Sequence, residues 1–304
     1  MKNINNTRKE ILLQLNTLKI DPNNFEKRKY EVEIKYYSEN IENPIKQINY
    51  NLNIDIERNE TTTLIINKEN YTLKQNQEDN LIDIINHNLS NIIYPLTLQI
   101  NEKFQIIKIL VNFQNLKKKW KTVSKKLTSK NNSLQLDELL EKSTQILTNK
   151  INFEEYLYQD WLWNILMHPK FLQYNKYQTK SIDFYLSIIP SQKPIKFKGN
   201  QKISKNENQK ISYCIDFESI EMKAHKYFIE KYKFITKPIL MKLEVQSEID
   251  VFHHFLIKTK ASLIIYSKDK YHKNNILHQI DFNLNQKNLN IYNENNLSGV
   301  NIFL

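Results

Sequence analysis

Residues 30–36, YEVEIKY, and residues 48–56, INYNLNIDI, alternate apolar and polar side chains almost without interruption. Successive side chains of a β-strand point to opposite faces, so a period of two is typical of strands that bury one face and expose the other. Residues 63–66, TLII, follow after a short polar break. This stretch therefore predicts three antiparallel strands joined by turns rich in Asn and Glu, and it decides the fold class of the first third of the chain.

The same two kinds of periodicity recur along the rest of the chain. Further short strands are predicted at residues 96–100, 105–113, 182–189, 194–197, 210–217, 239–246, 251–257, 261–266 and 276–284. Helical spacing of apolar residues predicts helices at residues 7–18, 81–89, 116–127, 136–147, 152–167 and 219–232. Ser133 and Ser219 are expected to cap two of these helices, because a hydroxyl oxygen at this position accepts a hydrogen bond from the first turn.

Together these elements predict an α+β fold. We expect two mainly antiparallel β-sheet regions, about residues 20–113 and 180–304, each with a covering helix, separated by a helical segment near 114–172. Along the chain this gives an N-terminal β-rich region at 1–130, a helical connector at 131–175 and a C-terminal β-rich region at 176–304. Both β-rich regions have three strands, a helix and then further strands, an order that fits a structural duplication or chance similarity in a strand-rich chain.

Glycine is almost absent, with only Gly199 and Gly299 among 304 residues. Phosphate-binding loops, dinucleotide-binding fingerprints and nucleophile elbows all need glycines at fixed spacing, so the sequence excludes these designs. Alanine is equally scarce while asparagine reaches 41 residues, a bias typical of an AT-rich coding sequence. Turns that need a positive φ are therefore expected to use asparagine in place of glycine.

The sequence contains no motif for catalysis, for a metal or for a cofactor. Cys214 lies in an apolar stretch typical of a buried strand, and a Cys–His nucleophile would need a histidine brought close by the fold. The adjacent His253 and His254 would point to opposite faces of one strand, and no H-E-x-x-H pattern occurs. We therefore expect no enzyme activity, no cofactor and no bound metal.

The expected location is the cytoplasm. Residues 1–10 are polar and do not resemble a signal peptide, and no apolar segment is long enough for a transmembrane helix. A single cysteine allows no internal disulfide, so nothing favours an oxidising compartment.

A run of lysines without an acid is the strongest local signal. Seven positive charges fall within residues 117–130, in a chain whose net charge is +11. Such a helix could bind an acidic protein, a phosphate backbone or an anionic membrane surface, or it could be the solvated face of a helix whose Leu116, Trp120, Val123 and Leu127 pack inward. The candidate partner-binding lysines are Lys117, Lys118, Lys119, Lys121, Lys125 and Lys126.

Trp163 is a further candidate for binding a partner. It lies two residues from Trp161 on a predicted helix, so the two rings cannot share a face, and exposed tryptophan is enriched at protein interfaces. The alternative is a helix buried on all sides between two β layers.

Four functions remain open from the sequence, of which an enzyme whose active site uses no recognisable motif is among the weaker ones. The first hypothesis is a non-enzymatic structural or interaction protein, a subunit of a larger assembly whose other subunits present an acidic surface. The second is a binding module in which curved sheets enclose an apolar or amphipathic ligand. Nonspecific nucleic-acid binding is a weaker alternative, because base and phosphate recognition favour arginine and the chain has only three. The sequence does not indicate the oligomeric state.

Overall fold

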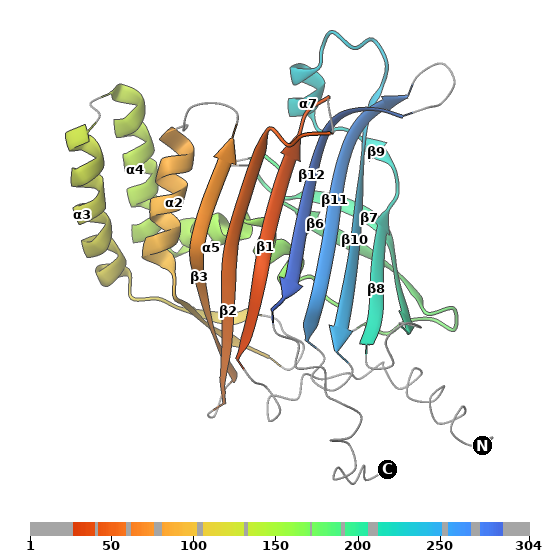
Figure 1. Ribbon diagram of the computed structural model, residues 1–304, viewed down its shortest axis with the longest axis horizontal. Coiled ribbons are helices and arrows are strands. Elements are labelled where there is room, and N and C mark those ends of the chain that lie inside the picture. Colours follow the sequence, from red (N-terminus) through yellow and green to blue (C-terminus); the bar gives the residue numbers. More distant parts are fainter. Residues whose placement is uncertain are drawn as a thin grey trace.

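The computed structural model describes residues 27–39, 42–58, 62–75, 81–101, 106–130, 133–170, 172–189, 192–205, 212–250, 255–268 and 274–287. Within them the chain forms one antiparallel sheet of 12 strands, seen in Figure 1. The strands are β1 Arg28–Tyr37, β2 Lys46–Arg58, β3 Thr62–Gln75, β4 Leu96–Ile100, β5 Ile106–Leu110, β6 Thr179–Leu186, β7 Ile195–Lys205, β8 Ser212–Ser219, β9 Met222–Lys223, β10 Ile239–Asp250, β11 Leu256–Lys268 and β12 Asn274–Gln286.

The two β-rich regions are joined into this single sheet, where the sequence led us to expect two sheet regions. The strand order is β5-β4-β3-β2-β1-β12-β11-β10-β8-β7-β6, and β9 pairs with β10. Strand β1 pairs with β12, with Val32 opposite Leu284 and Ile34 opposite Phe282. The first and last strands therefore lie at the centre of the sheet, and the helical middle segment links its two edges. The expected structural duplication stays a prediction.

Six helices lie in the described residues, and two of the predicted helices differ from the observed ones. They are α2 Leu81–Ile93, α3 Phe113–Lys130, α4 Leu134–Thr148, α5 Lys150–Tyr158, α6 Trp161–Leu166 and α7 Lys226–Lys231. Ser133 caps α4 as predicted, accepting a hydrogen bond from the Leu136 amide at 3.2 Å. The helix expected at 152–167 is divided into α5 and α6, because the Asp160 side chain accepts a hydrogen bond from the Leu162 amide and begins a new helix.

The helix expected at 219–232 is also shorter than predicted. Ser219 ends β8 instead of capping a helix, and the short strand β9 intervenes before α7 begins. Phe228 and Tyr232 are buried as the expected helical face requires, but Ile220 is exposed. The predicted strands 251–257 and 261–266 are likewise one strand, β11, over their described part. The helix predicted at 7–18 lies outside the described residues.

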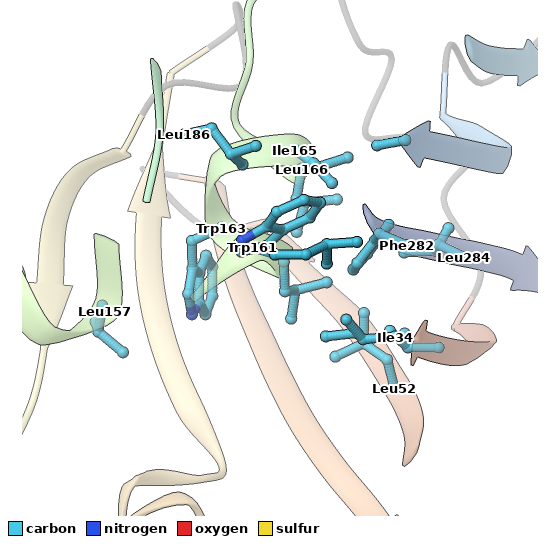
Figure 2. Packing of buried hydrophobic residues seen from close by; sticks show 14 of the residues in the cluster. Ile34, Leu52, Leu157, Trp161, Trp163, Ile165, Leu166, Leu186, Phe282 and Leu284 are labelled. Atoms are coloured by element: carbon cyan, nitrogen blue, oxygen red, sulfur yellow. The ribbon is translucent and has the colours of Figure 1, made fainter. Parts of the chain in front are cut away.

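The sheet is curled, and its inner face packs around α6. In Figure 1, β6 and β7 run behind the central strands, and α5 lies on the same side. Figure 2 shows the α6 side chains of Trp161, Ile165 and Leu166 close to Phe282 and Leu284 of β12. All of these side chains are buried. The space between the curled sheet and α6 is thus filled by the protein's own side chains, so this observation does not favour an enclosed ligand.

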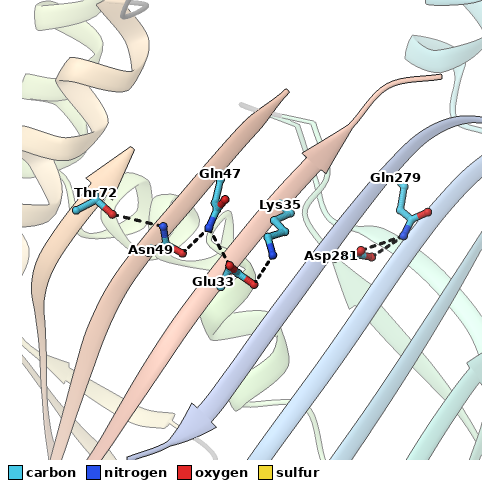
Figure 3. Close-up of polar contacts among 7 residues, drawn as sticks. All are labelled: Glu33, Lys35, Gln47, Asn49, Thr72, Gln279 and Asp281. Atoms are coloured by element: carbon cyan, nitrogen blue, oxygen red, sulfur yellow. Dashed lines mark hydrogen bonds and ion pairs between the residues drawn. The ribbon is translucent and has the colours of Figure 1, made fainter. Parts of the chain in front are cut away.

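The outer face of the sheet is polar, as the period of two predicts. On β1 and β2 the outward positions carry charged or amide side chains, and Figure 3 shows a row of contacts from Lys35 through Glu33 and Gln47 to Asn49. Gln279 and Asp281 form a similar contact on β12. Many of the asparagines therefore lie on the solvated face of strands. Among the described residues a positive φ occurs at Asn70 and Gln178 alone, so the expected use of asparagine in turns is seen at one position there.

Candidate functional site

The six candidate lysines all lie on the exposed surface of α3, at the side of the molecule where α2, α3 and α4 stand together in Figure 1. We call these residues the α3 lysine face: Lys117, Lys118, Lys119, Lys121, Lys125 and Lys126. Within the part of the chain that the structure describes, none of them forms an ion pair or a side-chain hydrogen bond. Their charges are therefore open to solvent or to a partner.

The packing of α3 explains why the lysines face outward. Leu116 and Trp120 are buried, and Val123 and Leu127 are partly buried against the core, which gives one apolar stripe along the helix. The Trp120 indole nitrogen donates a hydrogen bond to the Thr144 hydroxyl of α4 at 3.0 Å. This bond and the apolar stripe fix the rotation of α3, so that the lysines occupy the remaining surface.

The charge of α3 differs sharply from that of its neighbour. Helix α3 contains seven lysines and no acid, whereas α4 carries Asp137, Glu138 and Glu141 with one lysine. Because the acids of α4 form no ion pair with the α3 lysine face, α3 presents a concentrated positive surface. Such a surface attracts acidic partners over about a Debye length, near 10 Å at moderate salt.

A shallow groove of about 530 Å³ separates α3 from α4. Lys125 and Glu141 line it together with the hydroxyl groups of Ser124, Thr128 and Thr144. These three hydroxyls donate hydrogen bonds to helix carbonyl oxygens, so their hydrogens are already used within the protein. The groove therefore supplies few free donors to a ligand beyond the lysine ammonium.

Trp163 does not belong to this surface. Its side chain is only 1% exposed, and its indole nitrogen donates a hydrogen bond to the Tyr94 hydroxyl at 3.1 Å. The candidate role of Trp163 in binding a partner is thus corrected by its position: every α6 residue except Asn164 is buried, which is close to the alternative of a buried helix.

A partly buried ion pair beside Trp163 was not predicted from the sequence. The Lys68 ammonium of β3 pairs with the Asp160 carboxylate, and it lies 4.7 Å and 4.9 Å from the ring centroids of Tyr50 and Tyr94. Burial lowers the pKa of Lys68, but Asp160 and the Tyr50 hydroxyl outweigh burial and leave the pKa above its usual value. A lysine held in its charged form cannot act as a general base. The pair joins β3 to the start of α6, and no sequence signal links residues so far apart in the chain.

The other candidates for chemistry do not form a site. Burial raises the pKa of the Cys214 thiol, and the carboxylates of Asp216 and Glu248 act in the same direction, so the thiol is not activated as a nucleophile. No cluster of three potential metal ligands occurs among the described residues. His253 and His254 lie outside them. No helix in the described part of the chain is both long and apolar enough to cross a membrane.

A second basic surface, on and after α7, was also missed. The segment KYFIEKYKFITK at residues 226–237 interleaves lysines with aromatic residues, and this interleaving is a signal that the sequence does contain. The helix expected at 219–232 accounts only for the buried face of this segment.

Comparisons with known proteins find similarity among solved structures. No protein-family model matches the chain, and no curated protein matches it. A solved structure titled "Lipid-protein interactions in lipovitellin" is similar to it with a TM-score of 0.42 and 11% sequence identity. The match covers 86% of this chain and 25% of the lipovitellin chain, so this chain spans a quarter of that protein. At this TM-score the similarity carries no conclusion about function.

Proposed function

We propose that the protein is a non-enzymatic interaction protein, a subunit of a larger assembly, and that the α3 lysine face binds an acidic surface on another subunit. The observation that carries the proposal is the set of six exposed lysines without an ion-pair partner in the described residues. Binding in the cytoplasm, as expected from the sequence, is part of the same proposal.

The charge pattern supports an acidic protein over a nucleic acid. Helix α3 contains no arginine, and lysine cannot form the bidentate contacts through which arginine recognises phosphate and guanine. Complementary charge mainly raises the rate of association and selects among partners. We therefore expect a partner whose binding weakens steeply as salt is raised.

The proposal is tested by isolating the tagged protein from its native cells and identifying proteins that co-purify in stoichiometric amounts. A variant with Lys118, Lys121 and Lys125 changed to Gln should no longer co-purify with these partner proteins. Chemical cross-links between the partner proteins and α3 should also disappear in this variant. A matched control changes Lys180, Lys198 and Lys202, which are exposed on β6 and β7 and form no ion pair with a described residue, to Gln.

The two variants should be equally stable, because surface substitutions of this kind change the free energy of unfolding by about 0.5 kcal/mol or less. Equal loss of the partners in both variants would indicate a nonspecific charge effect and would contradict the proposal. A chain that purifies from its native cells alone, as a monomer, would also contradict it.

A further inference from the structure

Aromatic and basic side chains are exposed together at one end of the sheet. The segment between β9 and β10 carries α7, and Figure 1 shows α7 beyond the ends of the central strands. Phe234 is 69% exposed and Tyr227 is 44% exposed. We define the α7 tip as the exposed residues Lys226, Tyr227, Lys231, Lys233, Phe234 and Lys237.

Two buried aromatic side chains anchor this tip to the sheet. Phe228 and Tyr232 point inward, and the Tyr232 hydroxyl donates a hydrogen bond to the Leu277 carbonyl of β12 at 2.9 Å. The ring of Phe234 meets the Tyr232 ring edge-on, with 6.2 Å between centroids. The anchored turn therefore holds Phe234 outward. A single exposed apolar residue is ordinary, but this one is fixed beside a tyrosine and four lysines.

The tip has an excess of positive charge. Its four lysines face two acids, Glu230 within α7 and Glu39, whose carboxylate acts together with burial to raise the pKa of Tyr232. None of the four lysines forms an ion pair with a described residue. Lys231 instead lies over the ring of Tyr232, 5.3 Å from its centroid.

We propose that the α7 tip docks the protein onto the surface of a membrane that contains anionic lipids. Aromatic rings favour the boundary between headgroups and acyl chains, and lysines near the surface are attracted by anionic headgroups. In this orientation Phe234 and Tyr227 enter the boundary while the lysines remain at headgroup level. The lysine stems are long enough to place their charges outward as the rings descend.

Other partners fit the tip less well. At protein interfaces an exposed aromatic residue usually fills a pocket on the partner, whereas Phe234 and Tyr227 are surrounded by lysines that favour headgroups. Nucleic-acid recognition favours arginine, which the tip lacks. The membrane proposal is independent of the α3 lysine face, which lies on another helix.

The test is sedimentation of the full chain with vesicles of phosphatidylcholine, prepared with and without phosphatidylserine. The protein should sediment with the anionic vesicles at low salt and not with the neutral ones. Changing Lys231, Lys233 and Lys237 to Gln should weaken binding about a hundredfold, roughly fivefold for each lysine. Changing Phe234 to Ser should weaken it about tenfold, because an apolar ring no longer leaves water.

The three-lysine variant with Lys180, Lys198 and Lys202 changed to Gln is the matched control for charge, and it should bind as the natural chain does. All tip side chains changed here are exposed, so circular dichroism should show unaltered thermal unfolding for each variant. Full binding by the tip variants, or equal loss in the control, would overturn the proposal. Absence of sedimentation with anionic vesicles at low salt would overturn it too.

Insertion of the ring has its own readout. Trp120, Trp161 and Trp163 are buried, so their emission should not respond to vesicles. In a Phe234→Trp variant the added indole starts in water, and its emission should shift to the blue when anionic vesicles are added. The proposal would be overturned if vesicles alone caused no blue shift and single-stranded DNA displaced the protein from them. That result would assign the tip to nucleic-acid binding.

Discussion

Single residues fix how closely neighbouring strands approach, most clearly at Gly199 in β7. A Cβ atom at this position would lie 2.3 Å from the Glu218 carbonyl oxygen and 2.7 Å from the Phe217 ring, both in β8. Of the two glycines in the chain, this one is therefore required by packing and not by a positive φ. The scarcity of glycine gives no hint of this, since base composition explains the low count but not the position retained.

Substitution of Gly199 by Ala should lower the free energy of unfolding by about 1–3 kcal/mol, because an added methyl group in closed space forces the strands apart. Urea unfolding followed by circular dichroism measures the change. Lys198→Ala is the matched control on the exposed face of the same strand, and it should stay within about 0.5 kcal/mol of the natural chain. Equal stability of Gly199→Ala and the natural chain would contradict the close approach of β7 and β8.

His168 should make the stability of the protein depend on pH. Its ring stacks on Phe184 with 4.0 Å between centroids, and its Nε2 atom lies 2.8 Å from the Gln201 side-chain oxygen. Burial lowers the pKa of His168 from 6.5 to about 3, and the positive charge of Lys170 acts in the same direction. Between these two values the unfolded chain binds a proton that the folded chain does not, so stability is lost as pH falls.

The loss should approach about 1.4 kcal/mol per pH unit from His168 once the unfolded histidine is protonated. Urea unfolding at a series of pH values should show a shallower fall for His168→Gln than for the natural chain. Some slope should remain in the variant, because burial also lowers the pKa of His278 to about 4. An unchanged slope in His168→Gln would show that His168 is not held neutral in the folded state.

At the scale of elements, α6 is positioned by polar contacts as much as by its apolar side chains. Asp160 caps the helix and pairs with Lys68, Asn164 accepts a hydrogen bond from the Ser187 amide at 2.7 Å, and Trp163 donates to Tyr94. Apart from the cap, each contact joins α6 to a different part of the chain. The helix is six residues long, so these contacts and not its own hydrogen bonds must hold it in place.

Asp160→Asn should lower the free energy of unfolding by about 1–3 kcal/mol, because Asn can still cap α6 but leaves the Lys68 charge without its partner. We expect a smaller loss of stability than for a fully enclosed ion pair, since the Asp160 side chain is 31% exposed while that of Lys68 is 9% exposed. A double-mutant cycle with Lys68→Met isolates the pair from the cap. Additive effects of the two substitutions would show that the pair contributes nothing beyond its separate residues.

Most elements, but not their pairing, could be predicted from the sequence. The alternation in β1 and β2, the helical spacing in α3 and the Ser133 cap are local patterns, and each was confirmed near its predicted bounds. The break at Asp160 was missed because the apolar spacing continues across it, and only the hydrogen bond to Leu162 ends one helix and begins the next. The exposure of the α3 lysines follows from their spacing, whereas the burial of Trp163 depends on residues far along the chain.

For the whole molecule, the pairing of β1 with β12 is the decisive contact. It places the two ends of the described chain at the centre of one sheet. Without this pairing, β1 and β12 would each be an exposed edge strand of its own region. The same junction covers α6, since Figure 2 shows its Trp161 side chain facing Phe282 of one region, with Ile34 and Leu52 of the other region close by. Local periodicity cannot reveal such a junction, because the paired residues are about 250 positions apart, as for Ile34 and Phe282.

Separate expression of residues 1–175 and 176–304 should therefore give two chains that do not fold alone. The first would expose the edge of β1 and the inner side of α6, and the second would expose the edge of β12 with Phe282 and Leu284 uncovered. Each fragment should show poorly dispersed NMR spectra and no cooperative unfolding. Mixing or co-expressing the two fragments should restore well-dispersed spectra and cooperative unfolding. The full chain should unfold in one step, with tryptophan fluorescence and circular dichroism giving the same urea midpoint. A stable, cooperatively unfolding 176–304 fragment would show instead that the C-terminal region is an independent domain and that the β1–β12 junction joins two units already folded.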